Sequence, residues 1–211
     1  MSKILLIPGF QSEASLAILP DHSKDPTAGF GVFSNYIKNG QAIPYRWGIQ
    51  RRFTALDCLN PVAHMKLYWD EKKLSISDQT LTNLRGLIKL NNFETIVCHS
   101  MGCQVLLSYM IKFGLPEGVH KIIFVQGDIT NQSLNINTDS LTSIINKRVE
   151  WLNLHCFWDQ ALVSSAIAGL QLPIGLFGAE SSIVKNRSWP LWRRINLHTS
   201  SINDPGILKL I

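Results

Sequence analysis

The sequence predicts a single α/β domain: one doubly wound, mostly parallel sheet of about six strands, with helices on both faces. The length of 211 residues suits one domain with a sizeable core. Short apolar runs, typical of strands buried on both faces, alternate along the chain with stretches of helical period. Such alternation favours parallel strands joined by helices that cover the sheet.

The N-terminal part of the chain supplies the first elements. The apolar run Ile4–Ile7 predicts a central strand, which a Pro-Gly pair ends. Apolar residues on one face predict a helix over 31–39, and a second strand is expected over 42–47. Residues 48–76 mix basic and aromatic side chains without a clear period, so we expect short helical or irregular structure there. A Ser-Asp pair at 77–78 then caps an amphipathic helix.

The C-terminal part continues the alternation. Its strands are β-branched or aliphatic runs, expected at 95–97, 119–125, 150–156 and 192–197. Its helices are expected at 102–113, 141–145, 161–170 and 205–211. Residues 171–190 are interrupted by Gly and Pro and show no period, so no element is assigned to them. The domain therefore covers 1–211, with candidate lid segments at 10–30, 48–76 and 127–147.

Composition narrows the class of partner. The formal charge of +5 comes from 20 basic and 15 acidic residues, and the basic pairs are scattered without a long basic run. A solvated surface explains this pattern better than a nucleic-acid site does. No apolar run reaches the ~18–20 residues of a membrane span, and the apolar start is too short for a signal peptide. We expect a cytoplasmic protein, and the oligomeric state is left open.

The cysteines show no metal-binding or redox spacing. Three of them fall within predicted strands or helices, which indicates buried free thiols in a reducing compartment. The four cysteines are Cys58, Cys98, Cys103 and Cys156.

The chain is organised around a corner at residue 100. Thr95–Val97 is a β-branched run, and a helical period starts at Gly102, so a strand passes directly into a helix with Ser100 between them. Such a corner needs small residues two places either side of the serine, and Cys98 and Gly102 occupy those places. The hydroxyl would lie near the helix N-terminus, where backbone N–H groups favour negative charge.

The run His99-Ser100-Met101-Gly102 after a strand resembles the nucleophile elbow of α/β-hydrolases, G-x-S-x-G, with Cys98 at the first glycine. The alternative is a surface serine at the start of a buried helix. The resemblance extends over nearly the whole chain, as a compact form of the family. It implies a serine hydrolase, most readily a carboxylic ester hydrolase (a serine esterase or lipase-like enzyme), that cleaves an ester, thioester or amide through a Ser-His-Asp triad, without metal or cofactor.

The family order of serine, acid and histidine leaves one candidate base. His198 lies far beyond Ser100 and follows the predicted strand over 192–197. His155 falls inside a predicted strand and His120 starts one. The alternative for His198 is an exposed loop histidine.

Two aspartates could orient the base. Asp159 follows the predicted strand over 150–156 and resembles the family's acid; it could also cap the helix that follows. Asp128 follows the preceding strand and is the second candidate, in a run typical of turns. Asp204 is instead suited to cap the terminal helix.

The resemblance also implies an oxyanion hole. The family uses the N–H of the residue after the nucleophile, here Met101, and one from the loop after the first central strand. In that loop Pro8-Gly9 resembles the family's His-Gly pair, which makes Phe10 the second donor, with Gln11 close behind.

Parallel strands deliver their following residues to one edge of a sheet, so the candidate residues should meet there. The expected partner is a small-molecule acyl substrate with an apolar group. The rival class is a catalytically silent hydrolase-fold module that binds a ligand or protein, because Cys98 and Pro8 depart from the family pattern. A nucleotide-binding protein is disfavoured, since neither G-x-G-x-x-G nor G-x-x-x-x-G-K-[ST] occurs.

Overall fold

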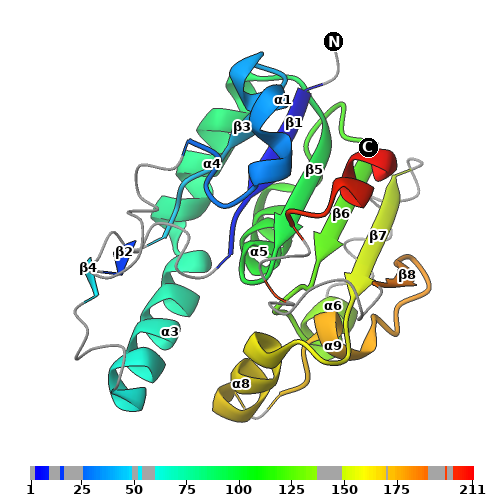
Figure 1. Cartoon of the computed structure of the whole chain (residues 1–211). Coiled ribbons are helices and arrows are strands. Elements are labelled where there is room, and N and C mark those ends of the chain that lie inside the picture. The colour runs from blue at the N-terminus through cyan, green and yellow to red at the C-terminus, as the bar shows by residue number, and fades with distance from the viewer. Residues whose placement is uncertain are drawn as a thin grey trace.

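The computed structural model describes most of the chain. The described residues are 3–9, 15–16, 26–48, 52–53, 60–136, 149–169, 171–189, 198 and 202–211. Within them, a six-stranded sheet has the order β3-β1-β5-β6-β7-β8, and a two-stranded sheet pairs β2 with β4 (Figure 1). Every pairing of the larger sheet is parallel, which confirms the predicted fold class.

The strands of the larger sheet are short. Their bounds are β1 Lys3–Ile7, β3 Ala42–Pro44, β5 Phe93–His99, β6 Lys121–Val125, β7 Glu150–His155 and β8 Lys185–Ser188. The two-stranded sheet consists of β2 Ser15–Leu16 and β4 Arg52–Phe53. The helices of the first half are η2 Gly31–Phe33, α1 Ser34–Lys38, α3 Pro61–Ser75 and α4 Asp78–Leu90. Those of the second half are α5 Gly102–Phe113, α6 Asn131–Ile136, α8 Gln160–Gly169, α9 Ile174–Phe177 and η4 Pro205–Leu210.

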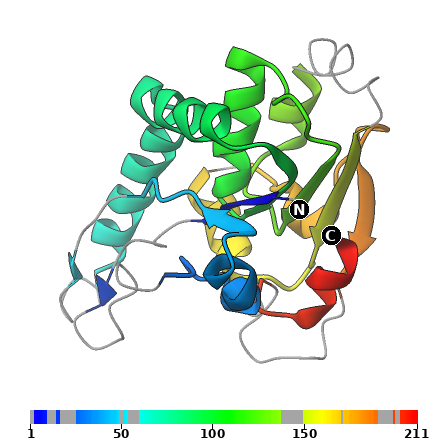
Figure 2. The same cartoon turned by 90° about the horizontal axis from the view of Figure 1, so that it is seen from above.

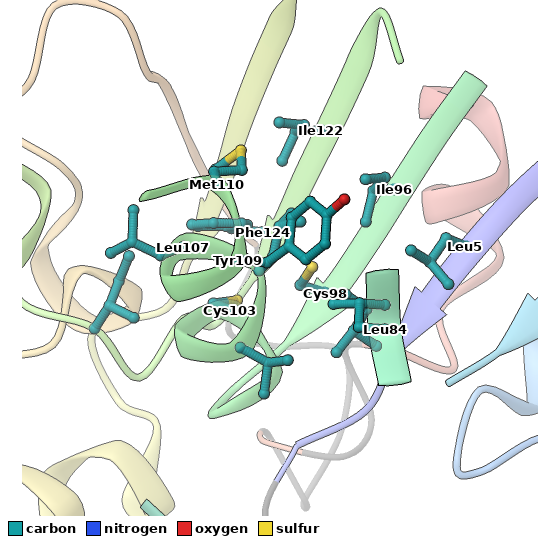
Figure 3. Close-up of a cluster of buried hydrophobic side chains, with 14 of the residues drawn as sticks. Leu5, Leu84, Ile96, Cys98, Cys103, Leu107, Tyr109, Met110, Ile122 and Phe124 are labelled. Carbon is teal, nitrogen blue, oxygen red and sulfur yellow. The ribbon is translucent and has the colours of Figure 1, made fainter. Parts of the chain in front are cut away.

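Helices cover both faces of the sheet (Figure 2). Successive side chains of a strand point to opposite faces, so Leu5 packs in one hydrophobic cluster and Leu6 in the other. The first cluster lies under α4 and α5, and Figure 3 shows the strand residues Ile96 and Phe124 in one cluster with Leu84 and Leu107 from these helices. The second lies under η2, α1 and η4. The central strands β1 and β6 are therefore buried on both sides, which explains the apolar runs Ile4–Ile7 and Ile122–Val125.

The helix starts follow from capping side chains. Ser77 accepts the N–H of Thr80 at 3.3 Å, as expected from the sequence, and so begins α4. Asn60 begins α3 by accepting from two backbone N–H groups of its first turn, with Pro61 in the first helical position.

The interpretation of 48–76 as short or irregular structure is wrong for its second half, where α3 runs for 15 residues. The helix has apolar side chains on two sides. Leu67 and Tyr68 are buried, whereas Val62 and Met65 are exposed. An apolar stripe on one face is the signal that a sequence offers for a surface helix, and α3 does not have one.

The sixth described strand is β8, within 171–190, where the sequence predicted no element. All four of its residues are exposed and polar, so no apolar run marks it. It pairs with β7 alone, and lysine and arginine are typical of such an edge strand. The predicted strand over 192–197 and the predicted helix over 141–145 lie outside the described residues, and α6 falls in 127–147, where no helix at that position was expected.

Two further expectations concern the termini and the membrane. Asp204 accepts the N–H of Gly206 at 2.7 Å, which confirms it as the cap of the terminal helix, here a 3-10 helix. In the part of the chain that the structure describes, no helix is both long and apolar enough to cross a bilayer.

Candidate active site

Ser100 lies at the turn between β5 and α5, at the carboxyl edge of the sheet. Its φ is +50°, a left-handed conformation that costs a non-glycine residue about 1–2 kcal/mol. The backbone holds it there, because its N–H donates to Val125 at 3.0 Å and its carbonyl accepts from Cys103 at 3.1 Å and Asp128 at 3.0 Å. The serine is therefore fixed in the strained geometry that a strand-to-helix corner requires.

Two glycines allow the chain to pack closely around this corner. A Cβ on Gly9 would lie 2.7 Å from the Cβ of Ser100. A Cβ on Gly102 would lie 2.5 Å from the carbonyl oxygen of Pro8. Both distances are shorter than atoms tolerate, so the loop after β1 can lie against the corner only with glycine at these places. Cys98, which stands where the family has a glycine, is fully buried in the core under α5.

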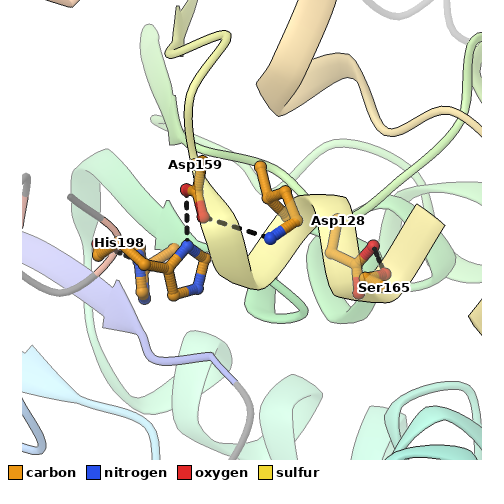
Figure 4. Close-up of polar contacts among 6 residues, drawn as sticks. Asp128, Asp159, Ser165 and His198 are labelled. Atoms are coloured by element: carbon orange, nitrogen blue, oxygen red, sulfur yellow. Dashed lines mark hydrogen bonds and ion pairs between the residues drawn. The ribbon is translucent and has the colours of Figure 1, made fainter. Parts of the chain in front are cut away.

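His198 and Asp159 meet through a short hydrogen bond. The Nδ1 of His198 lies 2.6 Å from Oδ2 of Asp159 (Figure 4). The aspartate is completely buried, and its other oxygen accepts the N–H of Leu162 at 3.1 Å. Asp159 therefore caps α8, as the sequence predicted, and at the same time holds the imidazole. A carboxylate on Nδ1 stabilises the tautomer in which Nε2 is unprotonated and can act as a base.

Asp128 has different partners. Its Oδ1 accepts from the hydroxyl of Ser165 at 2.6 Å (Figure 4). Its Oδ2 accepts from the hydroxyl of Tyr68 at 3.0 Å. Tyr68 belongs to α3 and Ser165 to α8, and their hydroxyls are 2.8 Å apart. Burial and the charge of Asp128 raise the pKa of Tyr68, so the phenol stays protonated. Asp128 thus ties α3 to α8, two helices that extend beyond the carboxyl ends of the strands (Figure 1).

His99, the residue before the nucleophile candidate, makes a contact with His198 that the sequence did not reveal. Its Nε2 lies 3.1 Å from the carbonyl oxygen of His198, and the two imidazole centroids are 4.5 Å apart. Only its place in the elbow motif could have drawn attention to it. Tyr68 was missed because 48–76 had no assigned face, and Ser165 because α8 is apolar on several sides.

The predicted oxyanion donors are only partly described. Met101 is the N-cap residue of α5 and its own side chain makes no capping hydrogen bond. Its N–H therefore lies at a helix N-terminus, directly after Ser100. Phe10 and Gln11 lie outside the described residues, as do much of 10–30, residues 54–59 and residues 137–147 of the candidate lid segments. His155 ends β7 and lies 3.3 Å from the hydroxyl of Ser188.

The possible metal ligands of the described residues do not gather into a metal-binding cluster. Within the described ranges, no three His, Cys, Asp or Glu side chains come together in a way that could hold a metal ion. Cys98, Cys103 and Cys156 are free and buried, and burial raises the pKa of each thiol. Cys58 lies outside the described residues.

Comparison with known proteins supports the fold. No protein-family model and no curated protein matches the sequence. A solved structure described as a thermostable esterase matches it with a TM-score of 0.52 and 12% sequence identity, over 99% of this chain and 54% of the esterase. The chain therefore spans about half the length of that enzyme. The parallel six-stranded sheet and this likeness together define an α/β-hydrolase fold, with an esterase among its structural neighbours.

Proposed function

We propose that this protein is a serine hydrolase that cleaves a carboxylic ester, or a thioester or amide, through an acyl-enzyme. Ser100 is the nucleophile, His198 the base and Asp159 the orienting acid. The observation that carries the proposal is the 2.6 Å contact between His198 Nδ1 and the buried Asp159, made across 39 positions of sequence. The strained φ of Ser100 at the same edge of the sheet supports it.

In the first half of the reaction, Nε2 of His198 takes the proton of the Ser100 hydroxyl as Oγ attacks the acyl carbon. The bond between the acyl carbon and the leaving oxygen, sulfur or nitrogen breaks when the tetrahedral intermediate collapses, and His198 gives the proton to that leaving atom. Asp159 stabilises the imidazolium that exists between these two transfers.

In the second half, a water molecule replaces the leaving group. His198 removes a proton from the water, whose oxygen attacks the acyl carbon, and the proton then returns to Oγ of Ser100 as the acid leaves. Backbone N–H groups stabilise the negative oxygen in both halves. We assign this role to Met101, at the start of α5, and to Phe10, and each such donor contributes about 3–4 kcal/mol in enzymes of this kind.

The substrate is proposed to carry a short to medium apolar acyl chain. Support comes from the aromatic and aliphatic residues of the candidate lid segments, among them Trp69 of α3, which is 39% exposed. Hydrolysis of acetyl, octanoyl and strongly anionic aryl esters would test this preference. Equal rates for all three would contradict it.

Steady-state turnover by Ser100→Ala tests the proposed function. Loss of the nucleophile should lower kcat by about 10⁴–10⁶-fold. Ser108→Ala is a matched control, because Ser108 lies in α5 and its described side-chain contact is with Gln104 of the same helix. Parent and control should be equally active. An inactive, folded parent would favour the catalytically silent module instead.

A further inference from the structure

The position of the His198 backbone depends on a contact outside the triad. Strand β8 ends at Ser188 and η4 begins at Pro205, so His198 lies outside every described strand. Its side chain is held by Asp159. Its carbonyl oxygen is held separately, by Nε2 of His99 at 3.1 Å.

The contact defines the tautomer of His99. A carbonyl oxygen can only accept a hydrogen bond, so Nε2 of His99 carries the hydrogen. His99 is 5% exposed, and burial, followed by the nearby His198, lowers its pKa well below the usual value. The ring is therefore neutral, with Nδ1 unprotonated and directed towards Gly9, where a Cβ would lie only 3.1 Å away.

The neutral state matters because the two rings are close. Their centroids are 4.5 Å apart and their planes are tilted by 46°. During the proposed reaction His198 becomes an imidazolium, and a second positive charge at this distance would oppose that step. A neutral His99 donates to the backbone of His198 without adding charge.

We propose that His99 is a positioning residue that fixes the backbone of His198 relative to Ser100, so that one strand end sets the position of both the nucleophile and the base. The inference rests on the proposed function. It accounts for the histidine at a motif position where the corner itself imposes no requirement for a polar side chain. The role is carried by the Nε2–H donor and not by the ring volume.

Two substitutions separate the donor from the volume. His99→Phe fills the space without a donor, whereas His99→Gln places an amide N–H where Nε2 lies. We expect His99→Phe to lower kcat by about 10–100-fold with KM nearly unchanged, since small displacements of a catalytic group have effects of this size. We expect His99→Gln to recover most of that loss. His120→Phe is the control, because His120 is exposed at the amino ends of the strands, away from Ser100. This variant should be as active as the parent.

The results distinguish this inference from the proposed function. An inactive parent contradicts the function, whereas an active parent with an equally active His99→Phe contradicts only the positioning role. Equal losses in His99→Phe and His99→Gln, with unchanged melting temperatures, would also overturn it. If His99→Phe does not fold, ¹⁵N NMR of the histidine rings in the parent protein decides. The Nε2–H tautomer of His99 is expected at neutral pH, and the Nδ1–H tautomer would overturn the inference.

Discussion

Replacement of Asp159 by asparagine should remove the activity while leaving the fold intact. Asparagine is as good an N-cap as aspartate, so the bond from Leu162 to the side chain and the start of α8 should survive. The new amide can donate to Nδ1 of His198, which then accepts. The hydrogen of the imidazole moves to Nε2, the nitrogen that the mechanism needs unprotonated. Both side-chain contacts of residue 159 are kept, yet the base is in the wrong tautomer.

The size of the effect follows from this tautomer change. In a triad that loses its acid in this way kcat falls by about 10⁴, which corresponds to about 5.4 kcal/mol of transition-state stabilisation. The cap is kept, so the free energy of unfolding should change by only about 1 kcal/mol. Asp159→Ala should cost about 1 kcal/mol more in stability, because it also removes the cap.

The assay compares Asp159→Asn with Asp128→Asn. Both proteins would be measured for kcat and kcat/KM on an aryl ester and for thermal unfolding by circular dichroism. Asp128 bonds to hydroxyls of α3 and α8, and an asparagine there can still accept from one of them. That variant should keep most of its activity. A folded Asp159→Asn with near-parental turnover, or a selective loss in Asp128→Asn, would refute the reasoning.

Two further predictions concern the close packing around Ser100 and the pH dependence of the free energy of unfolding. Gly102→Ala should prevent folding or destabilise the protein by several kcal/mol, because its Cβ would lie 2.5 Å from the carbonyl of Pro8. Gly86→Ala, in α4 with no atom near its Cβ, should stabilise by about 0.5–1 kcal/mol, and equal melting temperatures would contradict the packing argument. The folded-state pKa of His99 is depressed, so below its unfolded value near 6.5 the unfolded chain binds a proton that the folded chain does not. From about pH 7.5 to about pH 5.5 the parent should therefore lose more stability than His99→Phe in urea unfolding, by at most about 1.4 kcal/mol, and parallel curves would contradict this.

The sequence predicts the centre of the sheet better than its edge. Strands β1, β5 and β6 are buried on both faces, so each contains a run of three or more apolar residues. Strand β8 is polar and exposed, and it is held by its pairing with β7. Backbone pairing of this kind does not require apolar residues, so the hydrophobic pattern of the sequence does not indicate the strand. Helix α3 was not predicted for a different reason: it has apolar residues on two sides and therefore lacks the single apolar stripe by which a surface helix is recognised.

Some contacts of the candidate site could likewise be predicted from the sequence and others could not. The pairing of Asp159 with His198 was predicted on the expectation that each residue follows a strand end. The structure has the two side chains hydrogen-bonded, and the strand expected before His198 lies outside the described residues. Their catalytic roles stay predictions. The contact of His99 with the His198 backbone could not be predicted, because it depends on the exact position of a single carbonyl oxygen, which no residue pattern specifies. The position of Phe10 remains an expectation from sequence alone.

Labelling with a fluorophosphonate probe tests the central claim most directly, since the probe reacts with a serine only when a base activates it. The native parent should gain one adduct, which peptide mass spectrometry should locate on Ser100, and heat-denatured protein should gain none. Ser100→Ala should not be labelled, and Asp159→Asn should react far more slowly than the parent. A folded parent that takes no label, or a Ser100→Ala variant labelled as strongly as the parent, would contradict the account.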